Sequence, residues 1–89
     1  MPNILAQKLD ALGISITMTN GATFSKTAVD LRARFLLETG NTPAKKSKVV
    51  TWVRSEFAAT MNTSQLDPAG IQLDFNTATG APLELTITG

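Results

Sequence analysis

The most regular pattern along the chain is an alternation of apolar and polar residues, which has the period of a β-strand. Residues 14–19 (ISITMT) alternate without a break, and such alternation indicates a strand with one buried face. Asn20-Gly21 follows, a pair that favours a two-residue type I′ turn because both residues tolerate a positive φ. Residues 22–26 then supply a second strand, so the pattern predicts a β-hairpin.

A second hairpin is predicted near the end of the sequence. Residues 71–75 (IQLDF) and 83–87 (LELTI) both alternate, and residues 76–82 between them contain the Asn, Gly and Pro typical of a hairpin loop. Residues 67–70 (DPAG) predict a turn before the first of these strands.

The middle of the chain also has strand-like patterns. In residues 28–38 every second position is apolar, which predicts a long strand with a bulge or an extended arm. Residues 48–54 (KVVTWVR) are β-branched and aromatic on both faces, which predicts a central strand or one that a partner covers. Residues 39–47 contain Gly, Pro and no periodic apolar positions, so we expect an exposed loop there.

Helical spacing is clearest at the start. Ile4, Leu5, Leu9 and Leu12 have the spacing of a short helix that Gly13 would end. One more helical turn fits residues 55–61. The patterns together predict a mainly β fold, a small antiparallel β-barrel or sandwich of five to six strands with one short N-terminal helix.

Composition narrows the functional classes. Of the 89 residues, 43% are hydrophobic and 17% charged, which is the composition of one folded domain over residues 1–89. The net charge of +1 provides no bulk field to attract nucleic acid or anionic lipid. The chain has no His, Cys or Tyr, which excludes disulfides, thiolate and imidazole catalysis, and nearly every zinc site. We therefore expect a protein that is not an enzyme and needs no cofactor or metal.

Carboxylates are the remaining catalytic candidates, but each has an ordinary solvated position at a helix end, in a turn or on an alternating strand. They are Asp10, Asp30, Asp67, Asp74 and Glu84. No phosphate-binding or calcium-binding motif is present. The sequence thus predicts no catalytic, cofactor-binding or metal-binding residue.

The N-terminal residues indicate where the protein is made. Gln7, Lys8 and Asp10 interrupt the apolar run that a secretory signal requires. No stretch approaches the roughly 18 apolar residues of a membrane span. We expect a soluble protein made in a cytoplasm, with no membrane partner.

Apolar and basic residues on outward faces predict contacts with partners. Leu36 falls on the same strand face as Arg34 and Glu38, where it either forms a partner surface or is covered by a second layer of the same domain. Arg32 and Arg34 are candidates for ion pairs with acids of a neighbouring subunit. The full set of predicted contact residues is Arg32, Arg34, Leu36, Glu38, Lys45, Lys46 and Lys48.

An alternative is an OB-like module that binds single-stranded nucleic acid. Trp52 and Phe57 would stack on bases, while Arg54 and the lysines of residues 45–48 would bind phosphates. A solvated basic loop explains the same residues, and the small net charge favours that simpler interpretation.

Three stretches resemble the lambda-type bacteriophage head–tail joining proteins, which are small neck proteins between the portal complex and the tail. A short helix that leads into residues 16–21 (ITMTNG) is similar to that family's opening strand and turn. Residues 27–35 (TAVDLRARF) resemble its next long strand, and residues 51–57 (TWVRSEF) its strand-then-turn segment. The chain departs from the family at residues 67–71 (DPAGI), where Arg-Gly-Asp-like residues usually open a hairpin.

This resemblance implies a structural virion protein without enzymatic activity. Copies would assemble as a ring between the portal or adaptor and the tail, and nucleic acid would be contacted only in the channel of that ring. The family's long loop is implicated in attachment to neighbours, which places attachment at residues 38–47. A tail terminator or a capsid decoration protein would have a similar pattern.

Overall fold

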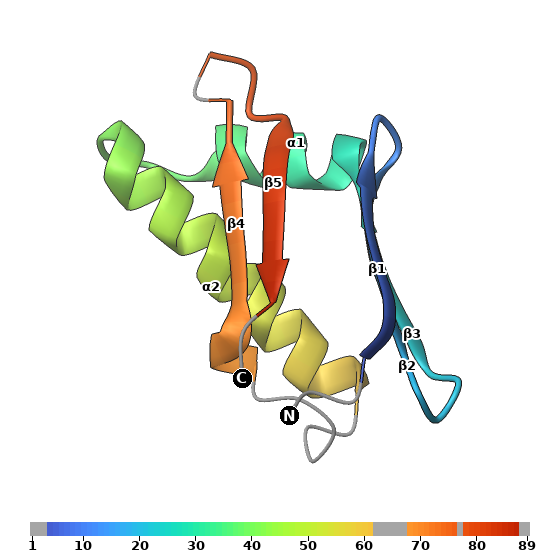
Figure 1. Cartoon of the computed structure of the whole chain (residues 1–89). Coiled ribbons are helices and arrows are strands. Elements are labelled where there is room, and N and C mark those ends of the chain that lie inside the picture. Colours follow the sequence, from blue (N-terminus) through green and yellow to red (C-terminus); the bar gives the residue numbers. More distant parts are fainter. Residues whose placement is uncertain (1–3, 62–67, 77, 88–89) are drawn as a thin grey trace.

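The computed structural model describes residues 4–61, 68–76 and 78–87. Three strands, two helices, a 3-10 turn and two more strands follow one another along the chain (Figure 1). They are β1 (Ile4–Asp10), β2 (Gly13–Met18), β3 (Thr23–Thr27), α1 (Ala28–Leu37), α2 (Thr42–Thr60), η1 (Pro68–Gly70), β4 (Ile71–Phe75) and β5 (Pro82–Ile87). The predicted barrel or sandwich is wrong. The described residues form a three-stranded and a two-stranded antiparallel sheet, neither closed, packed with two helices in a small α/β fold.

Both predicted hairpins are confirmed. In the first, β2 pairs with β3 so that Ile16 lies opposite Phe24. In the second, β4 pairs with β5 so that Leu73 lies opposite Leu85. Strict alternation on β2 and β4 produces this result because one face of each of these two strands is buried, and a shift of one residue would turn that face outward.

The turn of the first hairpin is longer than predicted. Met18 N donates to Ala22 O at 2.8 Å and Gly21 N donates to Met18 O at 3.0 Å, which leaves residues 19–21 as the loop. Gly21 has a φ of +90°, and every residue with a positive φ in the described ranges is a glycine. A type I′ turn needs a positive φ at both central residues, so Asn20 does not form one.

The predicted N-terminal helix is a strand. β1 pairs with β2, with an irregularity between Ile4 and Ala6. Leu5 and Leu12 are exposed, so the apolar residues that suggested a helix do not share a buried face. Gly13 begins β2 at a φ of +135°, and a Cβ there would overlap the main-chain oxygen of Lys26 and lie 2.8 Å from Ala28 N.

The predicted long strand over residues 28–38 is helix α1. Thr27 caps it, because its Oγ1 accepts a hydrogen bond from Asp30 N at 3.1 Å. Leu31 and Phe35, four residues apart, are the buried pair. Where every second residue is apolar, every fourth residue is apolar as well. The same sequence pattern therefore fits both a strand and one face of a helix.

The predicted loop over residues 39–47 and the predicted strand over residues 48–54 are also wrong. Helix α2 runs through most of both segments and contains the helical turn predicted for residues 55–61 up to Thr60. Asn41 caps it, with Oδ1 accepting from Ala44 N at 3.0 Å, and its buried residues are Val49, Val53 and Phe57. Their spacing of four residues places them on one helical face, which outweighs the strand preference of β-branched residues.

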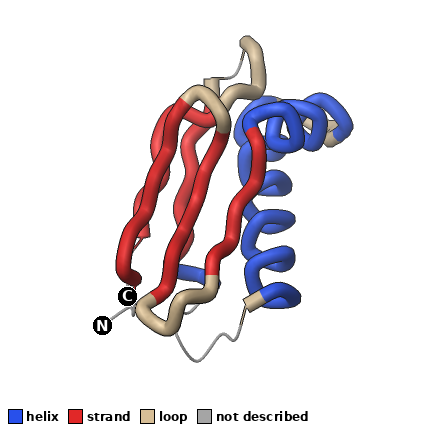
Figure 2. Tube along the Cα trace, turned by 90° about the vertical axis from the view of Figure 1, so that its right-hand side faces the viewer, coloured by secondary structure: helices blue, strands red, loops and turns tan. Residues whose placement is uncertain are grey.

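The two sheets meet at an angle where β1 lies next to β5, and the layer of helices lies on the inner side of that angle (Figure 2). Two aromatic contacts join the layers: the Phe24 and Phe57 rings meet edge-on at 5.3 Å, and the Phe35 and Phe75 rings lie 6.0 Å apart. All the described residues that are fully buried are apolar or glycine. The core therefore fixes which side of each helix faces outward.

Candidate functional site

The outer side of α1 carries a group of exposed large hydrophobic side chains. Val29, Leu36 and Leu37 are 68%, 65% and 69% exposed, and together they make up half of the six large hydrophobic side chains exposed in the described part of the chain. With Ala33 they have the helical spacing i, i+4, i+7 and i+8, which places them on one side of the helix. We call these four residues the α1 surface.

The fold holds this surface outward. Leu31 and Phe35 occupy the opposite side of the helix and are buried in the core, where Phe35 meets Phe75 of β4. The cap at Thr27 fixes the start of the helix immediately after β3. A rotation that covered Leu36 or Leu37 would therefore expose the core residues.

Charged residues border the α1 surface on both flanks. Asp30 and Arg34 are four residues apart and lie on one flank, while Arg32 lies on the other. Arg34 Nε is 3.1 Å from Glu38 Oε1, and the guanidinium lies 5.3 Å from the centre of the Trp52 ring. This border is mixed in sign.

Two open hollows meet at Trp52 between α1 and α2. The first, about 380 Å³, is lined by residues that include Ala33, Leu37 and Trp52. The second, also about 380 Å³, includes Lys48 and Glu38, and Lys48 Nζ donates to Thr39 O at 2.8 Å. The first hollow continues the α1 surface toward α2.

Of the seven predicted partner-contact residues, Arg34, Glu38 and Lys48 line the second hollow beside Trp52, and the other four lie outside it. Lys45, Lys46 and Lys48 lie in α2 instead of in a loop, and they have separate neighbours. Lys45 Nζ lies 5.5 Å from the Phe35 ring centre, whereas Lys46 Nζ is 2.9 Å from Asp74 Oδ1 on β4.

On α1, Arg34 and Glu38 pair with each other inside one chain. Leu36 is exposed, as its outward placement in the sequence suggested. Arg32 lies on the flank of the α1 surface away from Arg34. The contact role of these residues stays a prediction.

The residues of the nucleic-acid alternative point in different directions. Phe57 is fully buried against Phe24, so its faces are not open to a base. Arg54 Nε donates to Ile71 O at 2.9 Å and ties α2 to β4. Trp52 is half-buried, with Lys26 Nζ 5.0 Å from its ring centre. The three side chains form no common stacking surface.

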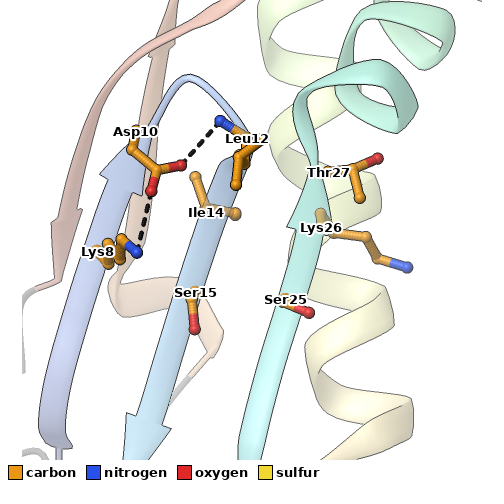
Figure 3. Close-up of a pocket in the computed structure, with 9 residues that line it drawn as sticks. Lys8, Asp10, Leu12, Ile14, Ser15, Ser25, Lys26 and Thr27 are labelled. Carbon is orange, nitrogen blue, oxygen red and sulfur yellow. Dashed lines mark hydrogen bonds and ion pairs between the residues drawn. The ribbon is translucent and has the colours of Figure 1, made fainter.

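A further hollow, about 230 Å³, lies over the three-stranded sheet (Figure 3). Asp10 is its only described acid, and the carboxylate accepts from Leu12 N at 2.8 Å and pairs with Lys8 Nζ at 3.1 Å. These two contacts, the first foremost, lower the pKa of Asp10. Ser15 and Ser25 also line this hollow, and the Asp10 carboxylate contacts Leu12 N and Lys8 Nζ, neither of which is a serine hydroxyl.

The other candidate carboxylates also offer little chemistry. Asp74 lies opposite Glu84 in the β4–β5 ladder. Its pKa is lowered mainly by the hydrogen bond from Lys46, so at neutral pH it is ionised and cannot donate a proton. Asp67 lies outside the described residues. Within the described residues, no three acidic or other metal-binding side chains come together.

The sequence interpretation missed most of the α1 surface, because in a strand Val29, Ala33 and Leu37 share a face with Leu31 and Phe35. One signal for the helix was available. Thr27 followed by Asp30 has the spacing of an N-cap and an acid in the first turn, which favours a helix start.

Comparison with family models, curated proteins and solved structures found no match to this chain, so no relative lends it a function. Neither helix in the described part of the chain combines the length and apolar composition needed to cross a membrane.

Proposed function

We propose that this chain is a structural, non-enzymatic component of a larger assembly, and that it attaches to neighbouring chains through the α1 surface. The observation that carries the proposal is the exposure of Val29, Leu36 and Leu37 on one side of a helix whose other side is buried. Exposed apolar side chains gathered on one face mark interaction sites, because burying them releases ordered water.

The resemblance to head–tail joining proteins gives this assembly an expected identity, a virion neck made of copies of this chain between the portal or adaptor and the tail. The support is partial. Residues 16–21 form the end of β2 and its turn, but residues 27–35 and 51–57 lie mainly in helices, where the resemblance needs strands. A tail terminator and a capsid decoration protein are virion roles that use the same kind of surface.

The attachment mechanism differs from that of a mobile loop. Residues 42–47 already form the start of α2, so no ordering of that segment is needed on assembly. The α1 surface is held rigid by the core, and a rigid surface loses little conformational entropy when it docks.

The test is whether the chain is built into particles. A tagged copy is expressed during phage growth, particles are purified on a density gradient, and mass spectrometry measures the copy number of the chain. We expect a fixed stoichiometry that falls when Leu36 and Leu37 are both changed to Asp. The matched control is Leu5→Asp, since Leu5 is similarly exposed on β1.

Absence of the chain from purified heads, tails and complete particles would reject the virion assignment. Titration of single-stranded oligonucleotides at low salt tests the nucleic-acid alternative in parallel, because stacking on Trp52 would quench its fluorescence. We expect no quenching.

A further inference from the structure

We propose that the α1 surface binds the α1 surface of a second copy of this chain, with the two helices antiparallel and Ala33 at the two-fold axis. This inference rests on the proposed function in one respect, namely that the α1 surface is the docking surface. It adds the identity of the partner, a second copy of this chain.

The sizes of the side chains on the α1 surface are compatible with a two-fold axis at Ala33. Along the helix the order is a large residue, Val29, then the small Ala33, then the large Leu36 and Leu37. When two such helices cross antiparallel at Ala33, Val29 of one copy lies beside Leu37 of the other. The small central residue lets the two backbones approach closely, and the larger side chains fill the space at both ends.

The charges on one flank also match under this arrangement. Asp30 lies three residues before Ala33 and Arg34 lies one residue after it. Antiparallel pairing therefore brings Asp30 of one copy to within about 3 Å, along the axis, of Arg34 of the other, at 1.5 Å per residue. The two-fold creates this pair twice, and the helix dipoles run in opposite directions, which is favourable.

The opposite flank weakens the contact. Arg32 of each copy lies on the same side of the pair and close to the axis, so two positive charges face each other there. The area is also small, because a ten-residue helix is about 15 Å long and a stable interface buries about 800 Å² on each partner. We therefore expect a weak dimer that exchanges rapidly.

Lipid is a poorer occupant of this surface. Asp30 lines the same hollow as Ala33 and Leu37, so an acid borders the apolar residues, whereas a helix that lies on an anionic membrane is rich in Lys and Arg on its flanks. A two-fold contact also joins copies only in pairs, so a ring would need a second, head-to-tail contact elsewhere.

Sedimentation equilibrium is the primary test. Protein concentration is varied from about 10 µM to about 1 mM, the range in which a small interface self-associates. We expect the average mass to rise from the 9.5 kDa of one copy toward twice that value. Leu37→Asp is expected to weaken association at least about tenfold, because it places a carboxylate in the apolar contact. Leu5→Asp, the matched control, leaves the association unchanged.

Charge exchange tests the antiparallel arrangement. Asp30→Arg places an Arg next to Arg34 of the other copy in both symmetry-related contacts. Arg34→Asp places an Asp next to Asp30 of the other copy in both contacts. Each variant alone should therefore associate more weakly than the wild type. In an equimolar mixture, a dimer of one Asp30→Arg chain and one Arg34→Asp chain again has opposite charges at both contacts. The association of the mixture should therefore return to near the wild-type value. Circular dichroism verifies that each variant is folded.

The outcomes separate this inference from the proposed function. A chain that remains monomeric at every concentration overturns the dimer, and so does a dimer that Leu37→Asp does not weaken. A mixture that associates no better than its two components overturns the antiparallel register. A monomer that sediments with phosphatidylglycerol vesicles assigns the surface to lipid and rejects the dimer. If the chain forms the dimer in solution but is absent from purified particles, the dimer is supported and the virion role is rejected.

Discussion

The two helices of this small fold are built from similar apolar residues but use them differently. α2 is 19 residues long and buries Val49, Val53 and Phe57, while its outer positions are mainly Lys, Ser, Thr and Ala. α1 is 10 residues long and buries Leu31 and Phe35, yet its outer side also carries three large apolar side chains.

The comparison distinguishes apolar residues that pack in the core from apolar residues that stay exposed on the folded chain. Packing within one chain accounts for every apolar side chain on the inner face of α2. On α1 the inner pair, Leu31 and Phe35, belongs to the core, whereas none of the three outer apolar residues is part of the described core. We propose a contact with another molecule as the reason for their presence, and on that proposal α1 carries the docking surface while α2 supports the fold.

Truncation of a buried α2 residue is expected to have the largest effect. Phe57→Ala removes a fully buried ring that packs edge-on against Phe24, and we expect a loss of about 3–5 kcal/mol in the free energy of unfolding. Urea denaturation followed by Trp52 fluorescence measures it. The control on the outer side of α2 is Thr51→Ala, expected to change the free energy by less than about 0.5 kcal/mol. Equal effects of the two variants would contradict the assigned helix faces.

Removal of a helix cap is expected to have an intermediate effect, similar for both helices. Asn41→Ala and Thr27→Ala each delete the side-chain acceptor of a first-turn N–H, and each should cost about 1 kcal/mol in urea denaturation. Asn41→Asp keeps the acceptor and should retain most of the stability. If Asn41→Ala has no effect, α2 does not begin where the structure places it.

Substitution on the outer side of α1 should have a small effect on the stability of the monomer. Leu36→Ser or Leu37→Ser changes a side chain that is about two-thirds exposed. The free energy of unfolding, measured at low protein concentration, should change by less than about 0.5 kcal/mol. Leu31→Ala on the inner side of the same helix should cost about 2–5 kcal/mol. A large loss for Leu37→Ser at low concentration would mean that the monomer itself needs this residue.

Acidification is expected to have the smallest effect, and of the two helices it is α2 that carries a lysine paired with an acid of lowered pKa. Lys46 of α2 lowers the pKa of Asp74 on β4. Because the folded pKa lies below the unfolded value of about 4, the stabilisation is complete above that pH and is lost as pH falls through the folded pKa. The melting temperature of the wild type should exceed that of Lys46→Gln at pH 7, and the two melting temperatures should converge at about pH 2.

The matched control for acidification is Lys45→Gln. Lys45 Nζ lies over the Phe35 ring and has no carboxylate partner in the described structure. Its variant should show no pH-dependent difference between about pH 5 and pH 2. A pH-dependent difference as large as that of Lys46→Gln would exclude the Lys46–Asp74 pair as the cause.

The sequence was informative where burial is one-sided. Residues 14–19 and 71–75 alternate because one face of each strand meets the core and the other meets solvent, and a period of two has few competing explanations there. The hairpins that contain them were therefore predictable.

Apart from the last turn of α2, the helices were not recovered from the sequence, for two physical reasons. On α1, apolar residues on both sides of the helix produce a false period of two from Val29 to Leu37. On α2, the run from Val49 to Val53 has strand propensity, and packing of every fourth residue onto the core overrides it. The candidate site was hidden by the same ambiguity, since only the helical conformation separates Val29, Ala33 and Leu37 from the buried pair.

Gly13 has an evolutionary consequence. Any side chain at this position would collide with the main chain where β3 passes into α1, and the φ of +135° is one that L residues rarely adopt. Descendants that keep this fold are therefore expected to keep glycine here even after the rest of the sequence has diverged. We expect remote relatives to share the spacing from Gly13 through the alternating residues 14–18 to Gly21 and the Thr27 cap.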